Sequence, residues 1–419
     1  MFLLYEFDLK DQSTPLYTIV NLSGKPLIKL RIKDINDDYY HVREKILKAL
    51  INAKIINKNT GIKWAIYGEE IMVTFIDLQY ILDKVNEEEQ YKSIYEIMVI
   101  RIYDDLIMFQ DITEYLRHLR GLYLKNINIP NCELSRLTNL YRLEILRLSD
   151  PPIIIPQEFS KLVLLHTLDI DNQQLTYIPE NLSIIPNLHK VDLSNNRLNP
   201  LPLSLFQLHK LEALNITNNG LTDIPNEITQ LTRLTHLNIS YNNITKYPEC
   251  INKIHTLEQL IYSYNKLTEI PNIQLPNLES LNLEWNKIVK CISNSINLPN
   301  LKKLELCNNN IVEFPDFIYS LQYLEHLDIG NFDNDIKSEL YDIISLTHLI
   351  IPVRQNDQSI SSDIGKLTNL EFLNIRGRGY SIPDEITNLG LLKYIYISKT
   401  QFNSMSEKMK LALKDKIYE

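Results

Sequence analysis

The feature that most constrains the fold is a segment of about 23 residues that recurs along the chain. Each copy begins with the spacing L-x-x-L-x-L and continues with x-x-N-x-L. A fixed period of this length predicts a solenoid, in which each unit packs mainly against its two neighbours. The clearest copies begin at Leu165, Leu188, Leu211, Leu234, Leu257, Leu278, Leu301 and Leu324. Only the step from Leu257 to Leu278 is shorter than the others.

The first half of each unit predicts a short strand. In an L-x-L segment the two leucines point to the same face, because successive side chains of a strand alternate between its faces. Strands of consecutive units would pair in parallel, and parallel strands need a crossover connection. The second half of the unit, for example "LTDIPNEITQ", is long enough to supply it. We therefore expect an array with a parallel sheet along one face.

One polar residue of the unit sits among apolar ones. In "LNISYNNI", Asn242 lies between Ile239 and Ile244, at a place where the chain has to turn inside the stack. A buried amide can satisfy backbone groups that have no partner there, because it carries both donors and an acceptor. The same position holds Asn196, Asn219, Asn265, Asn286 and Asn309. This predicts a structural ladder of asparagines, with less regular units where the position holds Gln173, Phe332, Arg354 and Arg378.

The pattern L-x-x-L-x-L-x-x-N-x-L-x-x-I-P resembles that of the leucine-rich repeat family, in its intracellular 23-residue form. The resemblance covers roughly residues 97–400, or about fourteen units with the weaker copies included. It implies an α/β fold, a leucine-rich-repeat solenoid shaped as a right-handed horseshoe with a parallel β-sheet on its concave face. It also implies a partner protein bound on that concave face.

The ends of the chain do not follow the repeat. We expect residues 1–92 to form a small α+β domain that caps the first unit, with a hairpin within "IKWAIYGEEIMVTFIDL". The repeats then occupy residues 93–402. Residues 403–419 are expected to form a C-terminal capping helix, with Met405, Met409 and either Ala412 or Leu413 on one side.

Composition disfavours several classes of protein. The net charge is −9, whereas general nucleic-acid binders are usually basic. The four cysteines form no C-x-x-C pair, so neither a disulfide framework nor a zinc site is predicted. The N-terminal "MFLLYEFDLKD" lacks the basic region of a signal peptide, and no apolar run is long enough for a membrane span. We expect a cytoplasmic monomer that needs no cofactor and no metal.

The sequence favours a non-enzymatic interaction scaffold. No arrangement of nucleophile and base appears in the repeats. His326 and His348 share one outward strand position in adjacent units, which is a weak signal for a metal site, and solvated or partner-contacting histidines are the favoured interpretation. Two alternatives stay open at this stage. One is an enzyme or regulatory switch whose activity lies in the N-terminal domain. The other is a bacterial effector that is delivered into host cells.

Three aromatic residues mark a candidate partner-binding site. Tyr241, Tyr264 and Trp285 occupy the eighth position of three consecutive units, where most other units have asparagine. They should form a row along one edge of the concave face, and exposed aromatic clusters are typical of interfaces. The alternative is that the rings stack on one another and only shield the turn below. Further candidates at outward strand positions are Ile261, Gln259, Glu284, His236 and the acidic Asp192.

Overall fold

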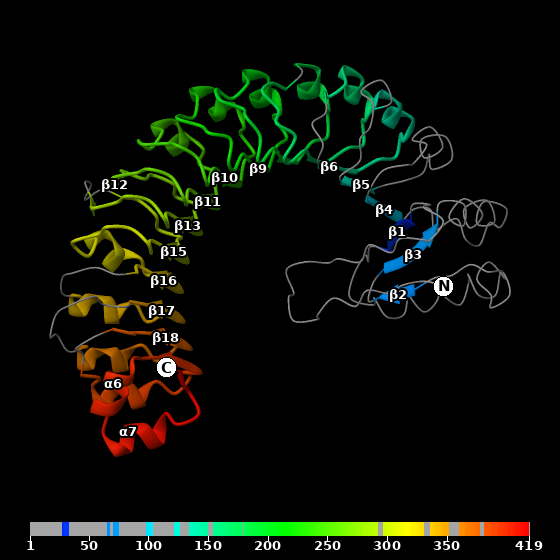
Figure 1. Cartoon of the computed structure of the whole chain (residues 1–419). Helices are drawn as coiled ribbons and strands as arrows, with labels where there is room; N and C mark the ends of the chain where they lie inside the picture. Colours follow the sequence, from blue (N-terminus) through cyan, green and yellow to red (C-terminus); the bar gives the residue numbers. More distant parts are fainter. Residues whose placement is uncertain are drawn as a thin grey trace. The chain divides into compact units, whose positions relative to one another are not determined.

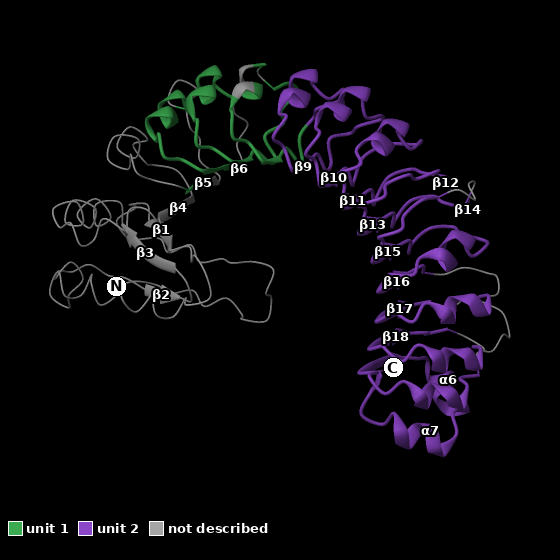
Figure 2. Ribbon diagram, turned by 180° about the vertical axis from the view of Figure 1, so that it is seen from behind, with its two compact units in different colours: residues 1–196 green, residues 197–419 purple. Residues whose placement is uncertain are grey.

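The structure is a computed structural model of the 419-residue chain. It describes residues 27–32, 65–67, 70–74, 98–103, 121–125, 134–149, 154–178, 180–291, 296–330, 336–351, 360–377 and 381–418. The chain divides into two compact units, residues 1–196 and 197–419, which Figure 2 colours green and purple. Each unit is described by itself.

Unit 1 begins with antiparallel strands and continues with parallel ones. Strand β1 (Leu27–Ile32) pairs antiparallel with both β3 (Glu70–Thr74) and β4 (Met98–Tyr103). Strand β2 (Ala65–Tyr67) pairs antiparallel with β3, which is the predicted hairpin pairing. From β4 the strands run parallel, each paired with the next, through β5 (Gly121–Lys125), β6 (Ile145–Ser149), β7 (Thr167–Asp169) and β8 (Lys190–Asp192). The helical part of the α+β domain expected over residues 1–92 lies outside the described residues.

Unit 2 is a stack of short parallel strands, each hydrogen-bonded to the next (Figure 1). They are β9 (Ala213–Asn215), β10 (His236–Asn238), β11 (Gln259–Ile261), β13 (Ser280–Asn282), β15 (Lys303–Glu305), β16 (His326–Asp328), β17 (His348–Ile350), β18 (Phe372–Asn374), β19 (Tyr394–Tyr396) and β20 (Ile417–Tyr418). In β9 to β19 the middle residue is buried and its neighbours face outward, as the alternation of a strand requires. The predicted fold class is confirmed.

In both compact units, short 3₁₀ helices form the side opposite the parallel strands. In unit 1 they are η2 (Ser135–Asn139), η3 (Gln157–Lys161) and η4 (Glu180–Ile184). In unit 2 they are η5 (Leu203–Gln207), η6 (Asn226–Gln230), η7 (Glu249–Lys253), η8 (Asp316–Ser320), η9 (Ser338–Asp342), η10 (Ser362–Lys366) and η11 (Asp384–Asn388). Five of those in unit 2 follow a proline, whose fixed φ holds the chain extended before the helix, for example −71° at Pro225. This explains the Ile-Pro pairs of the repeat.

The shortened repeat has a different connection. After β11 and β13 the chain forms β12 (Glu269–Ile270) and β14 (Lys290–Cys291), which pair in parallel with each other. The repeat from Leu257 to Leu278 is two residues shorter than the others, and its connection contains β12 where other repeats have a 3₁₀ helix. The sequence predicts a buried Cys291, but that side chain is partly exposed on β14.

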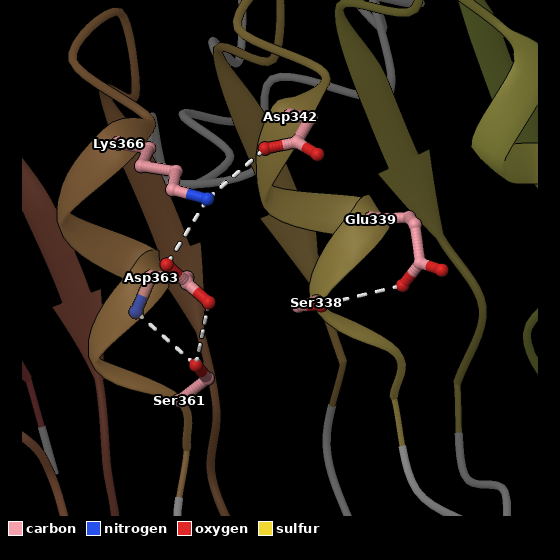
Figure 3. Close-up of polar contacts among 6 residues, drawn as sticks. All are labelled: Ser338, Glu339, Asp342, Ser361, Asp363 and Lys366. Carbon is pink, nitrogen blue, oxygen red and sulfur yellow. Dashed lines mark hydrogen bonds and ion pairs between the residues drawn. The ribbon is translucent and has the colours of Figure 1, made fainter.

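Polar contacts on the helical side link neighbouring units. Figure 3 shows Lys366 of η10 between two carboxylates, with its Nζ at 3.1 Å from Asp342 of η9 and 3.0 Å from Asp363 of η10. The Ser361 hydroxyl accepts a hydrogen bond from the Asp363 backbone N–H at 3.2 Å and caps η10. These groups are exposed to solvent, so they contribute little to the free energy of unfolding.

The predicted asparagine ladder is present. The Asn242 Oδ1 accepts the backbone N–H groups of Asn219 and Leu221 at 3.0 and 2.9 Å. Its Nδ2 lies 3.0–3.1 Å from the carbonyl oxygens of Ile216, Ile239 and Ser240. All six ladder side chains are buried. Gln173 is also buried, but its side-chain amide makes no hydrogen bond within the described part of the chain.

The C-terminus differs from the predicted single helix. The chain forms α6 (Lys399–Ser404) and α7 (Glu407–Ala412), and then β20 joins the sheet beside β19. The extended backbone of Met405 separates the helices, and Ser406 caps the second one. Met405 and Met409 are buried as predicted, and Leu413 rather than Ala412 is buried with them.

Gln401 takes the place of a ladder asparagine at this end. Its Nε2 donates to the Ile375 carbonyl at 2.9 Å, and its Oε1 accepts the Gly377 and Ser398 N–H groups. Ser398 and Gln401 also form a capping box at the start of α6. This role of Gln401 was not predicted, although the spacing S-x-x-Q in "SKTQ" is a signal for the capping box.

The free energy of unfolding should depend on pH because of Asp169 in unit 1. Burial, with repulsion from Asp192, raises the pKa of Asp169 from 3.8 to about 7, although Arg147 lies 3.4 Å away and lowers it. The folded state therefore binds this proton more tightly than the unfolded state. Its contribution to stability is complete below about pH 4 and is lost as pH rises through 7.

We therefore expect Asp169→Asn to stabilise the protein at pH 8 and to change little at pH 4. A pKa displacement of this size corresponds to about 4 kcal/mol. The carboxylate is 19% exposed and the variant loses the Arg147 pair, so we expect about 2 kcal/mol. Thermal unfolding of both proteins at the two pH values measures the effect, with exposed Glu158→Gln as the control. A variant less stable than the wild type at pH 8 would contradict it.

Candidate functional site

The aromatic row consists of Tyr241, Tyr264 and Trp285, and the structure brings all three together. The ring centroids of Tyr241 and Tyr264 are 4.0 Å apart with planes inclined by 9°. Those of Tyr264 and Trp285 are 5.1 Å apart with planes inclined by 11°. Both ends of the stack remain open to solvent, with Tyr241 51% and Trp285 48% exposed. The rings therefore stack and are exposed at the same time.

The backbone fixes the positions of these rings. Each residue of the row has a left-handed φ, of 55° at Tyr241, 54° at Tyr264 and 50° at Trp285. Each donates its backbone N–H to a carbonyl of the next unit at 3.0–3.1 Å. The residues before and after the row in this column are Asn218 and Asn308, with φ of 53° and 55°. The left-handed turn thus belongs to the repeat, and the aromatic side chains are what distinguishes these three units.

The other candidate residues of unit 2 lie on the same strand face. Gln259 on β11 stands between the exposed His236 on β10 and Ser280 on β13 in the strand register. Ile261 is half-buried and stands opposite Asn282. Asp192 belongs to unit 1, where it ends β8 and accepts the Ser194 N–H at 2.8 Å. The site geometry described below is that of unit 2 alone.

Glu284, the remaining candidate, belongs to a group that we name the Glu284–Cys307–Asp328 cluster. One ligand atom of each residue lies within 4.8 Å of the other two. The Cys307 Sγ is 2.6 Å from Glu284 Oε1, and the Asn282 Nδ2 donates to Glu284 Oε2 at 3.2 Å. Among the described residues these three are the group whose side chains could hold a metal ion. They come from three consecutive units, so no local motif reveals them.

Electrostatics in this cluster disfavour the charged forms of Cys307 and Asp328. Burial, with the hydrogen bond to Glu284, raises the pKa of the Cys307 thiol well above its usual range. Burial also raises the pKa of Asp328 to about 6, and the negative Glu284 adds to it. The Cys307 thiol is therefore a hydrogen-bond donor at neutral pH rather than a reactive thiolate.

A second aromatic surface lies on the last strands of unit 2. His326 and His348 have ring centroids 5.5 Å apart, and His348 stacks on Phe372 at 5.6 Å. Tyr394 and Tyr418 extend these contacts. From the sequence only the two histidines were considered, as a weak possible metal site, and the larger surface was not predicted. The signal was available, because His326, His348, Phe372 and Tyr394 fill the same position of four consecutive units.

Among the residues that the structure describes, no helix is both long enough and apolar enough to cross a membrane.

Comparison with known proteins supports the repeat assignment. The family model described as leucine rich repeat matches residues 186–244. A leucine-rich repeat protein of Leptospira interrogans is 25% identical, with a TM-score of 0.57, over 73% of this chain and 91% of that chain. An internalin (InlF) of Listeria monocytogenes is 23% identical, with a TM-score of 0.51, over 68% and 88%. A TDR receptor is 21% identical, with a TM-score of 0.53, over 68% and 56%.

No curated protein sequence matches the chain. The repeat model nevertheless falls on the units that contain the asparagine ladder, and the similar structures cover more than two thirds of the chain. The chain is therefore a leucine-rich repeat protein, and its fold class is the leucine-rich repeat solenoid.

Proposed function

We propose that the protein is a non-enzymatic scaffold that binds a partner protein on the strand-lined face of unit 2, with the aromatic row as the anchor. The leucine-rich repeat fold in general supports protein–protein interaction, because stacked repeats present an extended surface. The aromatic row supplies on that surface the large rings that dominate binding energy at interfaces.

The observation that carries the proposal is the left-handed backbone of the aromatic row. Bulky residues at positive φ are true outliers, whereas asparagine tolerates this conformation. Three such residues cost about 3–6 kcal/mol, at roughly 1–2 kcal/mol each. The two ring contacts return about 1–3 kcal/mol. Packing alone therefore does not explain why Tyr241, Tyr264 and Trp285 replace asparagine, and strain of this kind clusters at functional sites.

We expect Trp285→Ala to weaken partner binding by about 2 kcal/mol, or roughly 30-fold. The Trp285 ring is half exposed, so its removal should change the free energy of unfolding little. The experiment captures the partner from an extract of the native source and then measures its affinity for purified variants. Tyr264→Ala should show the same direction of change, and the pair together a larger loss.

Tyr323→Ala is the matched control, because Tyr323 is also in unit 2 and is 61% exposed but lies outside the aromatic row. It lines a shallow polar groove together with Glu258, Glu279 and Lys302. If Tyr323→Ala weakens binding while Trp285→Ala leaves it unchanged, the partner occupies that groove and the proposed site is wrong.

We also propose that the protein acts in the cytoplasm as a monomer. This part of the proposal is supported by the cysteines of the described residues, Cys250, Cys291 and Cys307, which are all free thiols. Thiol labelling of the protein isolated from its native source tests the location. Full labelling without a reductant is expected, and oxidised thiols would contradict it.

A further inference from the structure

Two carboxylates beside the aromatic row have no positive partner in the part of the chain that the structure describes. Glu284 directly precedes Trp285, and its carboxylate lies within 4.8 Å of that of Asp328. The nearby ion pair joins Lys303 to Glu305 at 2.8 Å and leaves this pair uncompensated. Two carboxylates at this separation repel each other strongly when both are charged.

Trp285, which ends the aromatic row, directly follows Glu284 in the chain. Trp285 stacks on Tyr264 through one ring face, and the next residue in the column, Asn308, carries no ring. The Asn308 side chain instead donates to the Cys307 sulfur at 3.3 Å. An indole ring face next to carboxylates attracts a cation, because the negative face of the ring and the charges act together. The surface thus combines the two groups that recognise lysine and arginine side chains.

We propose that the bound partner segment is basic, with an arginine or lysine side chain placed between the Glu284 and Asp328 carboxylates and against Trp285. This inference rests on the proposed function and specifies the chemistry of its partner. A guanidinium suits the place best, since its planar fork donates to two acceptors at once and its face stacks on an aromatic ring. The net charge of −9 would assist the approach of such a segment.

A metal ion fits the same three residues less well. A thiol must lose its proton to ligate zinc, whereas the Cys307 thiol keeps its proton and donates a hydrogen bond to Glu284. Burial and the neighbouring carboxylates keep the pKa of that thiol high. An incoming guanidinium requires no deprotonation of Cys307 and leaves its hydrogen bond in place.

The charge of Asp328 gives the binding a pH dependence. The titratable and charged groups around this place are Glu284, Cys307, Asp328, Glu305, His326 and Lys303. Asp328, with a pKa of about 6, gains its negative charge as pH rises from 5 to 7. His326 has a lowered pKa, because burial and Lys303 disfavour its charged form. Affinity for a cation should therefore rise from pH 5 to pH 7.

The test uses three fluorescein-labelled nonapeptides with the full chain, in fluorescence anisotropy at low salt. They share glycine and serine spacers and carry arginine, glutamine or glutamate at every third position. We expect the arginine peptide to bind at least about ten-fold more tightly than the glutamine peptide, and the glutamate peptide not to bind. The combined variant Glu284→Gln and Asp328→Asn should remove this preference without lowering the melting temperature.

Glu339→Gln with Asp342→Asn is the charge-matched control on the helical side, and it should keep the preference. Equal affinity for the arginine and glutamine peptides, or a preference that survives in the site variant, would overturn the proposal. So would the absence of any peptide binding. Zinc uptake that Cys307→Ser abolishes, without an arginine preference, would assign the cluster to a metal. In each case a loss of partner binding in Trp285→Ala would still support the scaffold function.

Discussion

Replacing Asn242 by alanine should lower the free energy of unfolding by about 3 kcal/mol or more. The amide accepts two backbone N–H groups and donates to the carbonyl oxygens of two successive units. An alanine leaves these groups buried without partners, and each such group costs about 1–3 kcal/mol. No water can replace the amide without opening the stack, because the Asn242 side chain is buried between neighbouring units.

Asn243→Ala is the matched control for this change. Asn243 is the next residue in the chain and is exposed, so its loss should alter stability by less than about 0.5 kcal/mol. Urea unfolding of the full chain, followed by circular dichroism, measures both variants. If Asn242→Ala unfolds at the same urea concentration as Asn243→Ala, the ladder does not stabilise the solenoid.

Gly330→Ala is expected to cost about 3 kcal/mol. Gly330 is buried with a φ of 64°, and a Cβ at this position would lie 2.8 Å from the Cys307 Cα. Backbone cannot move aside as the end of a side chain can. The left-handed conformation adds about 1–2 kcal/mol for an alanine, and the forced contact adds about as much again.

Variants of two other glycines distinguish the cost of the left-handed conformation from the cost of the close contact with Cys307. Gly220 has a φ of 74°, but nothing would lie within 4 Å of its Cβ, so Gly220→Ala should cost only about 1 kcal/mol. Gly390 has neither a positive φ nor a close neighbour, so Gly390→Ala should be neutral or slightly stabilising. Thermal unfolding ranks the three variants. A Gly330→Ala loss no larger than that of Gly220→Ala would show that the close approach to Cys307 is unimportant.

Most of the fold could be predicted because the same pattern of leucines and asparagine recurs along the chain. The spacing of leucines sets the strand, and one asparagine per unit marks the turn, so each feature is confirmed by its recurrence. The irregular places were harder to predict. The extended connection at Ile270 and the division of the C-terminal helix at Met405 depend on how much chain is available locally. Gln401 was missed because it serves the ladder from a helix rather than from a turn.

The candidate site could be predicted only in part. Tyr241, Tyr264 and Trp285 were visible because they interrupt a column of asparagines in consecutive units. Their left-handed backbone, on which the proposed binding role rests, was not visible from the sequence. The approach of Glu284, Cys307 and Asp328 also needed the structure, because these residues belong to three different repeats. Asp192 was selected for its charge, and the structure places it in unit 1 rather than with the other candidates.

Photo-crosslinking tests the central claim, that the aromatic row contacts a partner protein, most directly. Benzoylphenylalanine is introduced in place of Tyr241, and separately in place of Leu203, which is 57% exposed on the helical side of unit 2. Both proteins are irradiated in an extract of the native source, and adducts are resolved by mass. We predict a discrete adduct from the Tyr241 position and none from the Leu203 position. An adduct from Leu203 alone would place the interface on the helical side and contradict the proposed function.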